Sequence, residues 1–437
     1  MSTPGTLARY FSRLSSLSTM RWQGRVLQVT GQLVESEGPF CSVGELCNIV
    51  SSNGEMFPGE VVGFRGSTVL SMPLEPPRGI RFSDTIETWG ERPAIRVSDE
   101  LMGRVIDAKG DPLDSEGPYE AQEYRMIDAA APLPLERQPI REAIGCGIRA
   151  IDGFLTCGRG QRVGVFGGSG VGKSTLIGMM ARNTSADLTV VALVGERGRE
   201  VRHFLEEALD EQGRKRAVVV VSTSDQSPLL RLRAALSATA IAEYFCNCGK
   251  NVLLVVDSLT RLAMAQREIG LAAGEPPTSK GYTPSVFNLM AKLIERAGNL
   301  LAGSITAFYT VLMEGDDEQD PIADGARALL DGHILLDRRL TARGHYPPIS
   351  VLDSISRLMP SVASAAHMLK ANQLRKLLAS YRASEDLIRI GAYQKGSDAE
   401  LDRAIALLPT LNSFLQQLPT EKVSLSVNVE KLLGIAA

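Results

Sequence analysis

The chain has 437 residues, of which 44% are hydrophobic and 22% are charged, and its formal net charge is −3. This length is too great for one ordinary hydrophobic core and predicts two or three domains. The near-neutral charge excludes wholesale binding to nucleic acid or to an anionic membrane, although it allows a local basic patch. No apolar run reaches the roughly 18 residues of a membrane span, and the start lacks a signal-peptide core. We therefore expect a soluble cytosolic protein with reduced cysteines.

The first residues carry an amphipathic pattern within the range 1–21. Its apolar positions share one face of a helix, and Arg9 and Arg13 lie largely off that face. These positions are Leu7, Tyr10, Phe11, Leu14 and Leu17. The pattern allows either a binding helix or a terminus that frays or packs on the chain itself.

Residues 22–90 are rich in short β-type runs separated by Gly, Pro, Asn and Ser. This rhythm predicts a small antiparallel barrel or sandwich. Residues 91–145 are rich in Gly, Pro and Asp, and we interpret them as a long connection with short strands.

From Gly160 onward, apolar strands alternate with amphipathic helices, one of which is expected over residues 199–210. Such alternation predicts the α/β class, with a mostly parallel sheet covered by helices on both faces. After about residue 361 the pattern is helical to the end. The predicted order is therefore β, then α/β, then α.

The segment GGSGVGKST, residues 167–175, matches the P-loop pattern and lies between a predicted strand and a predicted helix. In a P-loop, glycines let backbone amides surround a phosphate at the positive end of the helix. Lys173 would reach the β- and γ-phosphates, and the Ser174 hydroxyl would bind Mg²⁺. The predicted nucleotide-binding residues are Gly167, Gly168, Ser169, Gly170, Val171, Gly172, Lys173, Ser174 and Thr175.

Two acids each follow an apolar strand. Asp257 ends NVLLVVD and suits the Walker-B role of holding the Mg²⁺ shell, although a lone acid at such a position can also cap a helix. Glu196 follows the strand 187–194, which comes directly after the P-loop helix and can lie close to the P-loop strand. A carboxylate there can polarise a water for attack on the γ-phosphate. The alternatives are a solvated acid or a partner of Arg197 or Arg199.

Five longer motifs then occur in one order and carry a family resemblance. They are GGSGVGKST, VGERGREV, LLVVDSLTRLAMAQREIGLAAGEPPTSKGYTPSVF, YTVLMEGDDEQDPIADGARALLDGHILLDR and SISRLMP. They resemble the rotary-type ATPases of the ATP synthase catalytic-subunit superfamily, most closely the type III secretion ATPases and among these the flagellar export ATPases. The resemblance covers nearly the whole chain. It implies a RecA-like P-loop core at residues 92–361, between a β-barrel domain at 22–91 and a C-terminal helical domain at 362–437.

The resemblance also implies roles for individual residues. Glu196 matches the catalytic glutamate, Arg197 the neighbouring arginine that organises the γ-phosphate site, and Asp257 the Walker-B aspartate. Arg357, in SISR, matches the arginine finger that enters the site of the neighbouring subunit. Tyr346 matches the tyrosine that stacks on adenine.

One segment departs from the family pattern. The family has an acid in the PAID-like segment before the finger, whereas this chain has PPIS with Ser350. The departure leaves the detailed geometry around Tyr346 open.

A finger that acts in trans implies a ring, most simply a homo-hexamer that hydrolyses Mg-ATP. The resemblance implies further partners: a central stalk protein, export chaperones and unfolded substrates, and a stator-like regulator bound by residues 1–21. It also implies peripheral association with the export gate at the cytoplasmic face of the inner membrane.

Several other functions compete with flagellar export. An injectisome ATPase and an ATP synthase catalytic subunit share the core motifs. A non-catalytic ring subunit would carry Gln in place of Glu196. A ring motor on nucleic acid would need a basic, aromatic barrel, but residues 22–90 contain only four basic residues. We therefore expect no nucleic-acid partner.

Overall fold

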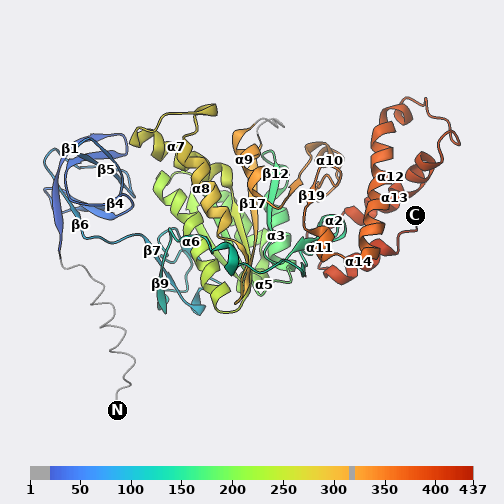
Figure 1. Cartoon of the computed structure of the whole chain (residues 1–437), viewed down its shortest axis with the longest axis horizontal. Coiled ribbons are helices and arrows are strands. Elements are labelled where there is room, and N and C mark those ends of the chain that lie inside the picture. Colours follow the sequence, from blue (N-terminus) through green and yellow to red (C-terminus); the bar gives the residue numbers. More distant parts are fainter. Residues whose placement is uncertain (1–19, 314–319, 437) are drawn as a thin grey trace, which may run out of the picture.

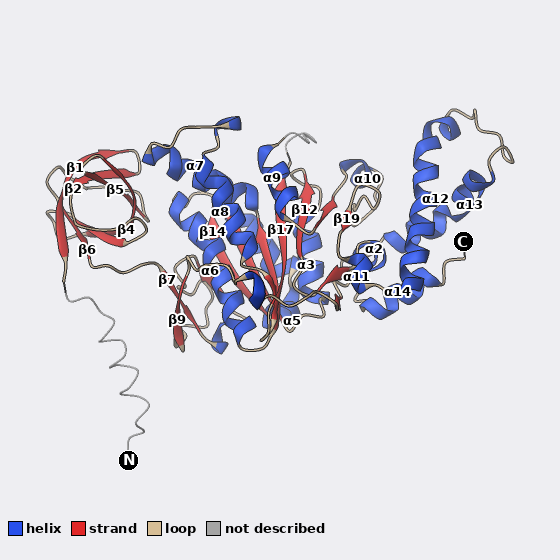
Figure 2. Cartoon of the chain, in the orientation of Figure 1, coloured by secondary structure: helices blue, strands red, loops and turns tan. Residues whose placement is uncertain are grey.

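The computed structural model describes residues 20–313 and 320–436. Three regions follow one another along the long axis of the molecule: a barrel, a central sheet with helices on both faces, and a helical C-terminal region (Figure 1). The predicted fold class, a barrel followed by an α/β core and a helical region, is confirmed (Figure 2). The amphipathic pattern around Leu7 falls outside the described residues.

The N-terminal region is a closed antiparallel barrel, which decides between the barrel and the sandwich. Its strands are hydrogen-bonded in the order β1-β2-β5-β4-β3-β6, and β1 pairs with β6 to close the ring. Alternate side chains fill the interior, including Val26, Val34, Ile49 and Ile86. The strands are β1 Trp22–Thr30, β2 Leu33–Glu37, β3 Leu46–Val50, β4 Met56–Arg65, β5 Thr68–Pro73 and β6 Thr85–Thr88.

The central sheet has the strand order β19-β18-β12-β17-β15-β13-β14-β8, with the short β16 paired to β17. All neighbouring strands in this order are parallel except β18 and β19. Two strands, β17 and β15, separate the P-loop strand β12 from β13, so the expected closeness of these two strands is wrong. The strands are β8 Val105–Asp107, β12 Arg162–Gly167, β13 Leu188–Glu196, β14 Ala217–Thr223, β15 Asn251–Asp257, β16 Gly298–Asn299, β17 Ser304–Leu312, β18 Gly332–Leu335 and β19 Ile355–Ser356.

The connection before the core contains short strands, as predicted for residues 91–145. Strand β8 joins the edge of the central sheet beside β14. Two small antiparallel sheets form as well, one from β7 (Ala94–Val97) with β9 (Glu123–Met126), the other from β10 (Ala143–Ile144) with β11 (Cys157–Gly158).

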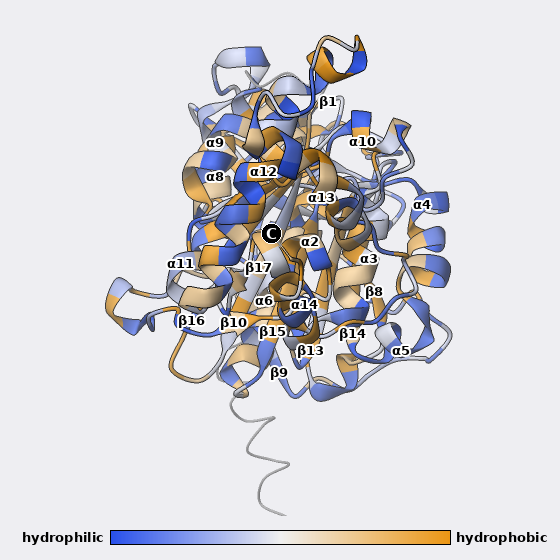
Figure 3. Ribbon diagram, turned by 90° about the vertical axis from the view of Figure 1, so that its right-hand side faces the viewer, coloured by the Kyte–Doolittle hydropathy of each residue, from blue (hydrophilic) through white to orange (hydrophobic). Residues whose placement is uncertain are grey.

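Hydrophobic cores lie on both faces of the central sheet, which explains the nearly continuous apolar strands. In β13, Val190 and Ala192 belong to one core, whereas Val191 and Leu193 belong to the other. Apolar residues gather toward the strands, and polar residues cover the outward turns of the surface helices (Figure 3). The helices include α2 Arg149–Phe154, α3 Lys173–Asn183, α6 Pro228–Asn247, α7 Leu259–Ala273, α8 Pro284–Glu295, α9 Pro321–Leu329, α10 Arg338–Ala342 and α11 Met359–Val362.

The helix expected over residues 199–210 is interrupted. It consists of α4 (Gly198–His203) and a π-helical turn (Phe204–Ala208), and α5 (Asp210–Lys215) follows. This turn approaches α3 so closely that a Cβ added at Gly178 would lie 2.4 Å from the Ala208 carbonyl oxygen. The predicted apolar face is still directed inward, because Phe204, Ala208 and Leu209 are buried in the core.

The C-terminal region is formed by α12 (Ala365–Arg389), α13 (Ala399–Leu415) and α14 (Leu425–Leu433). Both α12 and α14 pack against α2, next to the core. Within residues 20–313 and 320–436, no helix is long and apolar enough to cross a membrane.

Candidate functional site

The P-loop connects the carboxyl end of β12 to the first turn of α3. Gly170 and Gly172 adopt positive φ angles of 75° and 103°. An added Cβ at either position would meet nothing within 4 Å, so the backbone conformation and not packing requires glycine there. Ser169, Gly170, Ser174 and Thr175 are exposed at the rim of the loop. The loop therefore has the conformation and the accessibility that phosphate binding requires.

Lys173 is only 8% exposed although it carries an ammonium group. Its Nζ donates hydrogen bonds to the Gly167 carbonyl oxygen at 2.9 Å and to the Gly168 carbonyl oxygen at 2.7 Å. Burial lowers the pKa of this ammonium to about 8, against the charges of Asp257 and Glu196, which raise it. The cation is thus held inside the loop by backbone acceptors.

Asp257 lies at the carboxyl end of β15 and is buried. Its Oδ1 accepts a hydrogen bond from Thr310 Oγ1 of β17 at 2.6 Å. Burial raises the pKa of the carboxyl group, whereas the bond from Thr310 and the charges of Lys173 and Arg261 lower it. A buried carboxylate that faces a lysine in this way suits a cation-binding role.

Glu196 ends β13 with its side chain 14% exposed. Its Oε1 lies 3.2 Å from Nε of Arg261, a residue of α7. Burial, a hydrogen bond with Glu200 and the charge of Asp257 together raise the pKa of Glu196 to about 8, against the charge of Arg261, which lowers it. The structure therefore brings the charged groups of Glu196, Asp257 and Lys173 close enough to affect one another's pKa, at the carboxyl ends of the strands.

Arg197 is placed differently from the other predicted site residues. Its side chain is 76% exposed and forms an ion pair with Glu200 across 3.7 Å. The hydrogen bond to Glu196 holds the pKa of Glu200 below its usual value. Arg197 thus reaches the acidic pair from outside and does not enter the buried cluster.

Tyr346 borders a cavity of about 720 Å³ beside the P-loop helix. Tyr346 is 47% exposed, and its backbone carbonyl oxygen accepts a hydrogen bond from the backbone amide of Gln417 at 2.9 Å. The cavity is also lined by Gly172, Thr175, Leu176, Met179, Pro409, Gln416, Gln417 and Pro419. Ser350, where the sequence departs from the family pattern, lies away from this lining and donates to Asp353 Oδ2 at 2.5 Å.

Arg357 does not approach the P-loop of its own chain. It is exposed directly after β19, and its amide donates to the Asp331 carbonyl oxygen at 3.0 Å. The Asp331 amide in turn donates to the carbonyl oxygen of Arg162, the first residue of β12. Arg357 is therefore level with the amino end of β12, whereas the P-loop follows the carboxyl end.

Sequence reasoning missed Arg261, Glu200 and Thr310, which surround the two acids. The sequence did contain a signal for Arg261. Because α7 begins two residues after Asp257, Arg261 in its first turn must lie near the end of β15. The C-terminal residues that line the cavity gave no such signal, since they come from a distant part of the sequence and only packing brings them to α3.

Three family models match consecutive parts of the chain. The β-barrel domain of the ATP synthase alpha/beta family matches residues 26–90, and the nucleotide-binding domain of that family matches residues 147–356. A model of the T3SS EscN ATPase C-terminal domain matches residues 363–433.

Individual proteins are similar over almost their full length. The Flagellum-specific ATP synthase of Bacillus subtilis is 51% identical over 414 residues, which cover 94% of either chain. The assembled ATPase EscN of the enteropathogenic E. coli type III secretion system superposes with a TM-score of 0.90 at 43% identity. This match covers 95% of the present chain and 100% of EscN. EscN in complex with its central stalk EscO gives a TM-score of 0.87 at 42% identity, with the same coverage.

A RecA-like core, a P-loop and two carboxylates at the adjoining strand ends define a P-loop ATPase. The chain belongs to the ATP synthase alpha/beta family, in its branch of flagellar and type III secretion export ATPases.

Proposed function

We propose that this ATPase hydrolyses Mg-ATP as a ring, with Glu196 as the general base, and thereby energises protein export through a flagellar-type type III secretion apparatus. The observation that carries the catalytic part is the convergence of Glu196, Asp257 and Lys173 beside the P-loop. A subunit that only held nucleotide would not need a second carboxylate there.

The residues present fit the phosphates and Mg²⁺. Backbone amides of residues 167–175, with Lys173, would hold the phosphates, and the adenine would occupy the cavity beside Tyr346. The exposed Ser174 hydroxyl and the buried Asp257 carboxylate offer the oxygen donors that Mg²⁺ prefers, the aspartate acting through water. Bound Mg²⁺ would offset the negative charge of the phosphates during hydrolysis.

Glu196 would take the proton of the attacking water. Its carboxyl group lies 3.2 Å from Arg261 Nε and forms a hydrogen bond with Glu200, so charged groups surround it. Burial, the hydrogen bond with Glu200 and the charge of Asp257 raise its pKa to about 8, so its ionised form, which increases as the pH rises toward 8, is a stronger base than the carboxylate of an exposed glutamate. Arg197, which forms an ion pair with Glu200, would help to organise the γ-phosphate site.

Arg357 would act in trans on the site of a neighbouring subunit. Its position at the amino end of β12 leaves it remote from its own P-loop, and the EscN relative was solved as an assembled ATPase. A homo-hexamer is therefore the assembly that we propose. The finger would stabilise charge on the transferring phosphoryl group, an effect typically worth roughly 10³–10⁵ in rate.

A mixing experiment tests this arrangement. Lys173→Ala lacks a working P-loop but keeps its finger, whereas Arg357→Ala lacks the finger but keeps its P-loop. Each variant alone should be nearly inactive in single-turnover hydrolysis. Rings mixed in equal amounts should regain up to about a quarter of the active sites, because each rescued site needs one subunit of each kind. Mixed rings as inactive as the separate variants would contradict the trans finger.

We also propose a division of the chain and a partner for each of its parts. The C-terminal helical domain, residues 362–437, would face a central stalk protein, as the EscN complex with EscO suggests. Residues 1–21 would bind a stator-like regulator, the barrel at 22–91 would form a collar, and residues 92–361 would hydrolyse ATP. Export chaperones and unfolded substrates would be delivered to a membrane export gate at the cytoplasmic face of the inner membrane.

Co-purification from the native cell tests the export assignment. We expect flagellar export components, in keeping with the flagellar relative. Recovery of injectisome components or of ATP synthase subunits instead would contradict the flagellar assignment while leaving the ATPase chemistry intact.

A further inference from the structure

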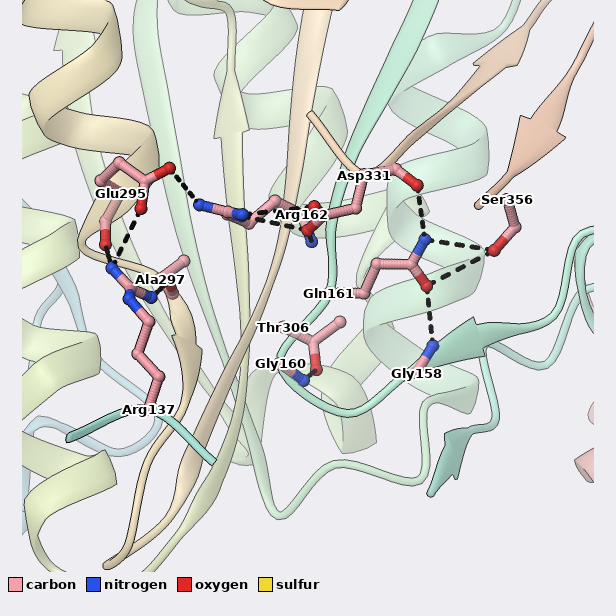
Figure 4. Close-up of polar contacts among 10 residues, drawn as sticks. All are labelled: Arg137, Gly158, Gly160, Gln161, Arg162, Glu295, Ala297, Thr306, Asp331 and Ser356. Carbon is pink, nitrogen blue, oxygen red and sulfur yellow. Dashed lines mark hydrogen bonds and ion pairs between the residues drawn. The ribbon is translucent and has the colours of Figure 1, made fainter. Parts of the chain in front are cut away.

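A polar network lies at the amino end of β12 in the central sheet and includes Ser356, the last residue of β19, which directly precedes Arg357 (Figure 4). Its centre is Gln161, which is fully buried, with 0% exposure. Oε1 of this side chain accepts from the Gly158 amide at 2.8 Å. Nε2 donates to the Asp331 carbonyl oxygen and to Ser356 Oγ, both at 3.1 Å. One buried amide therefore connects three separate segments of the chain.

Two of these contacts flank the finger. Ser356 immediately precedes Arg357, and its hydroxyl also donates to the Thr156 carbonyl oxygen at 2.9 Å. The Asp331 carbonyl oxygen accepts both from Gln161 and from the Arg357 amide. The backbone of Arg357 and the residue before it are thus bound to the same buried side chain, directly or through one acceptor.

Charged residues hold Asp331 from the other side. Arg162 donates to Asp331 Oδ2 at 3.0 Å through Nε and to Oδ1 at 3.2 Å. The same guanidinium reaches Glu295 Oε1 at 2.5 Å, and Arg137 reaches Glu295 Oε2 at 3.1 Å. This row of alternating charges fixes the acceptor that Gln161 and Arg357 share.

The strand that presents the finger needs such support. β19 has only two residues, pairs with β18 alone and lies at the edge of the sheet. Two residue pairs give little intrinsic stability to a strand, so contacts outside the ladder must set its position. Satisfied buried hydrogen bonds are directional, and removing one partner leaves the other groups unsatisfied.

We infer that Gln161 is a positioning residue for the arginine finger: it holds the Ser356–Arg357 segment in the place from which Arg357 enters the neighbouring site. This inference rests on the proposed trans action of Arg357. Gln161 itself does not touch the nucleotide site, because the P-loop lies at the other end of β12. That strand has six residues, a span of roughly 20 Å at about 3.3 Å per residue.

The test uses full-length rings of Gln161→Met, a change that keeps the approximate length and the burial of the side chain but removes its hydrogen bonds. We expect single-turnover hydrolysis to fall roughly 10–100-fold, as for a catalytic group displaced by about 1 Å. The dissociation constant for Mg-ATP should stay unchanged, because the P-loop is intact.

Mixing separates a misplaced finger from general damage. Gln161→Met mixed with Lys173→Ala should recover activity, since Lys173→Ala supplies an intact finger to the intact P-loop of its neighbour. Gln161→Met mixed with Arg357→Ala should not recover, because neither subunit supplies a finger. Thr306→Val is the matched control: it removes the 2.9 Å hydrogen bond from the Gly160 amide in the same turn but touches neither Ser356 nor Asp331. Its rings should keep nearly full hydrolysis.

Two results would overturn the inference. Failure of Gln161→Met to recover with Lys173→Ala, while Arg357→Ala does recover with it, would show that Gln161 acts within its own subunit. Failure of both mixtures would overturn the trans finger, and this role of Gln161 with it. If Gln161→Met does not assemble, Ser356→Ala allows the same comparison, because it removes the other end of the 3.1 Å contact.

Discussion

Glu196 Oε1 lies 3.2 Å from Arg261 Nε. Glu196 is the last residue of β13, and Arg261 lies in the first turn of α7. This ion pair joins a strand end to the helix that follows Asp257. Its cation opposes the rise in the pKa of Glu196 that burial causes. The pair therefore affects the protonation of the proposed base, although burial is the largest influence on its pKa.

Replacement of that base should separate binding from hydrolysis. Glu196→Gln keeps the size of the side chain but cannot accept a proton, so we expect Mg-ATP binding close to that of the parent. Turnover should fall by at least about 100-fold, the usual contribution of general-base catalysis. Calorimetric titration and a phosphate-release assay measure the two quantities. Turnover within a few-fold of the parent would show that another group takes the proton.

The same substitution should change how stability depends on pH. The folded-state pKa of Glu196 is about 8 and its ordinary value is 4.5, so the folded protein binds this proton more tightly than the unfolded chain. Its stabilising contribution is complete below the ordinary value and is lost as the pH rises through about 8. Glu196→Gln should therefore gain melting temperature relative to the parent between about pH 5 and pH 9.

Thermal unfolding of both proteins without nucleotide, over that pH range, checks this expectation. Glu430→Gln, at an exposed position of α14, is the matched control, because it also removes one carboxyl group but lies outside the site. A Glu196→Gln difference from the parent that stayed constant with pH would mean that the carboxyl group is not held in its protonated form.

Asp257→Asn should weaken metal-dependent binding specifically. The Asn side-chain oxygen can still accept the bond from Thr310, so the local structure should persist, but the negative charge is lost. We expect the affinity for Mg²⁺ in the nucleotide complex to fall about 10–100-fold. Titration of nucleotide with Mg²⁺ and with a chelator distinguishes this loss from a loss of nucleotide binding itself. Thr310→Val, which removes the hydroxyl donor, should have a much smaller effect.

Tyr346 should contribute to nucleotide affinity through its ring. Tyr346→Ala removes the surface on which we expect adenine to stack, and such stacking is worth about 1–3 kcal/mol per base. Tyr346→Phe keeps the ring and should bind ATP nearly as the parent does. Equilibrium binding of ATP and of inorganic triphosphate makes the test: only ATP should lose affinity in Tyr346→Ala. Equal losses for both ligands would place adenine elsewhere.

Local patterns in the sequence determined much of this protein. The P-loop requires positive φ angles at Gly170 and Gly172, and its glycines and lysine are recognisable without any structure. The apolar strands that end in Glu196 and Asp257, and the helical C-terminal region, also follow from residue type and periodicity. These features depend on interactions between residues that are near one another along the chain.

Only the tertiary structure decided how these pieces meet. Contacts between distant segments insert β17 and β15 between β12 and β13 and bring Gln417 to Tyr346. They also place Arg357 at the amino end of β12, away from the P-loop of its own chain. Strand order is set by which pairings bury most apolar surface and satisfy most backbone hydrogen bonds across the whole sheet. That balance belongs to the folded chain as a whole, so no short stretch of sequence carries it.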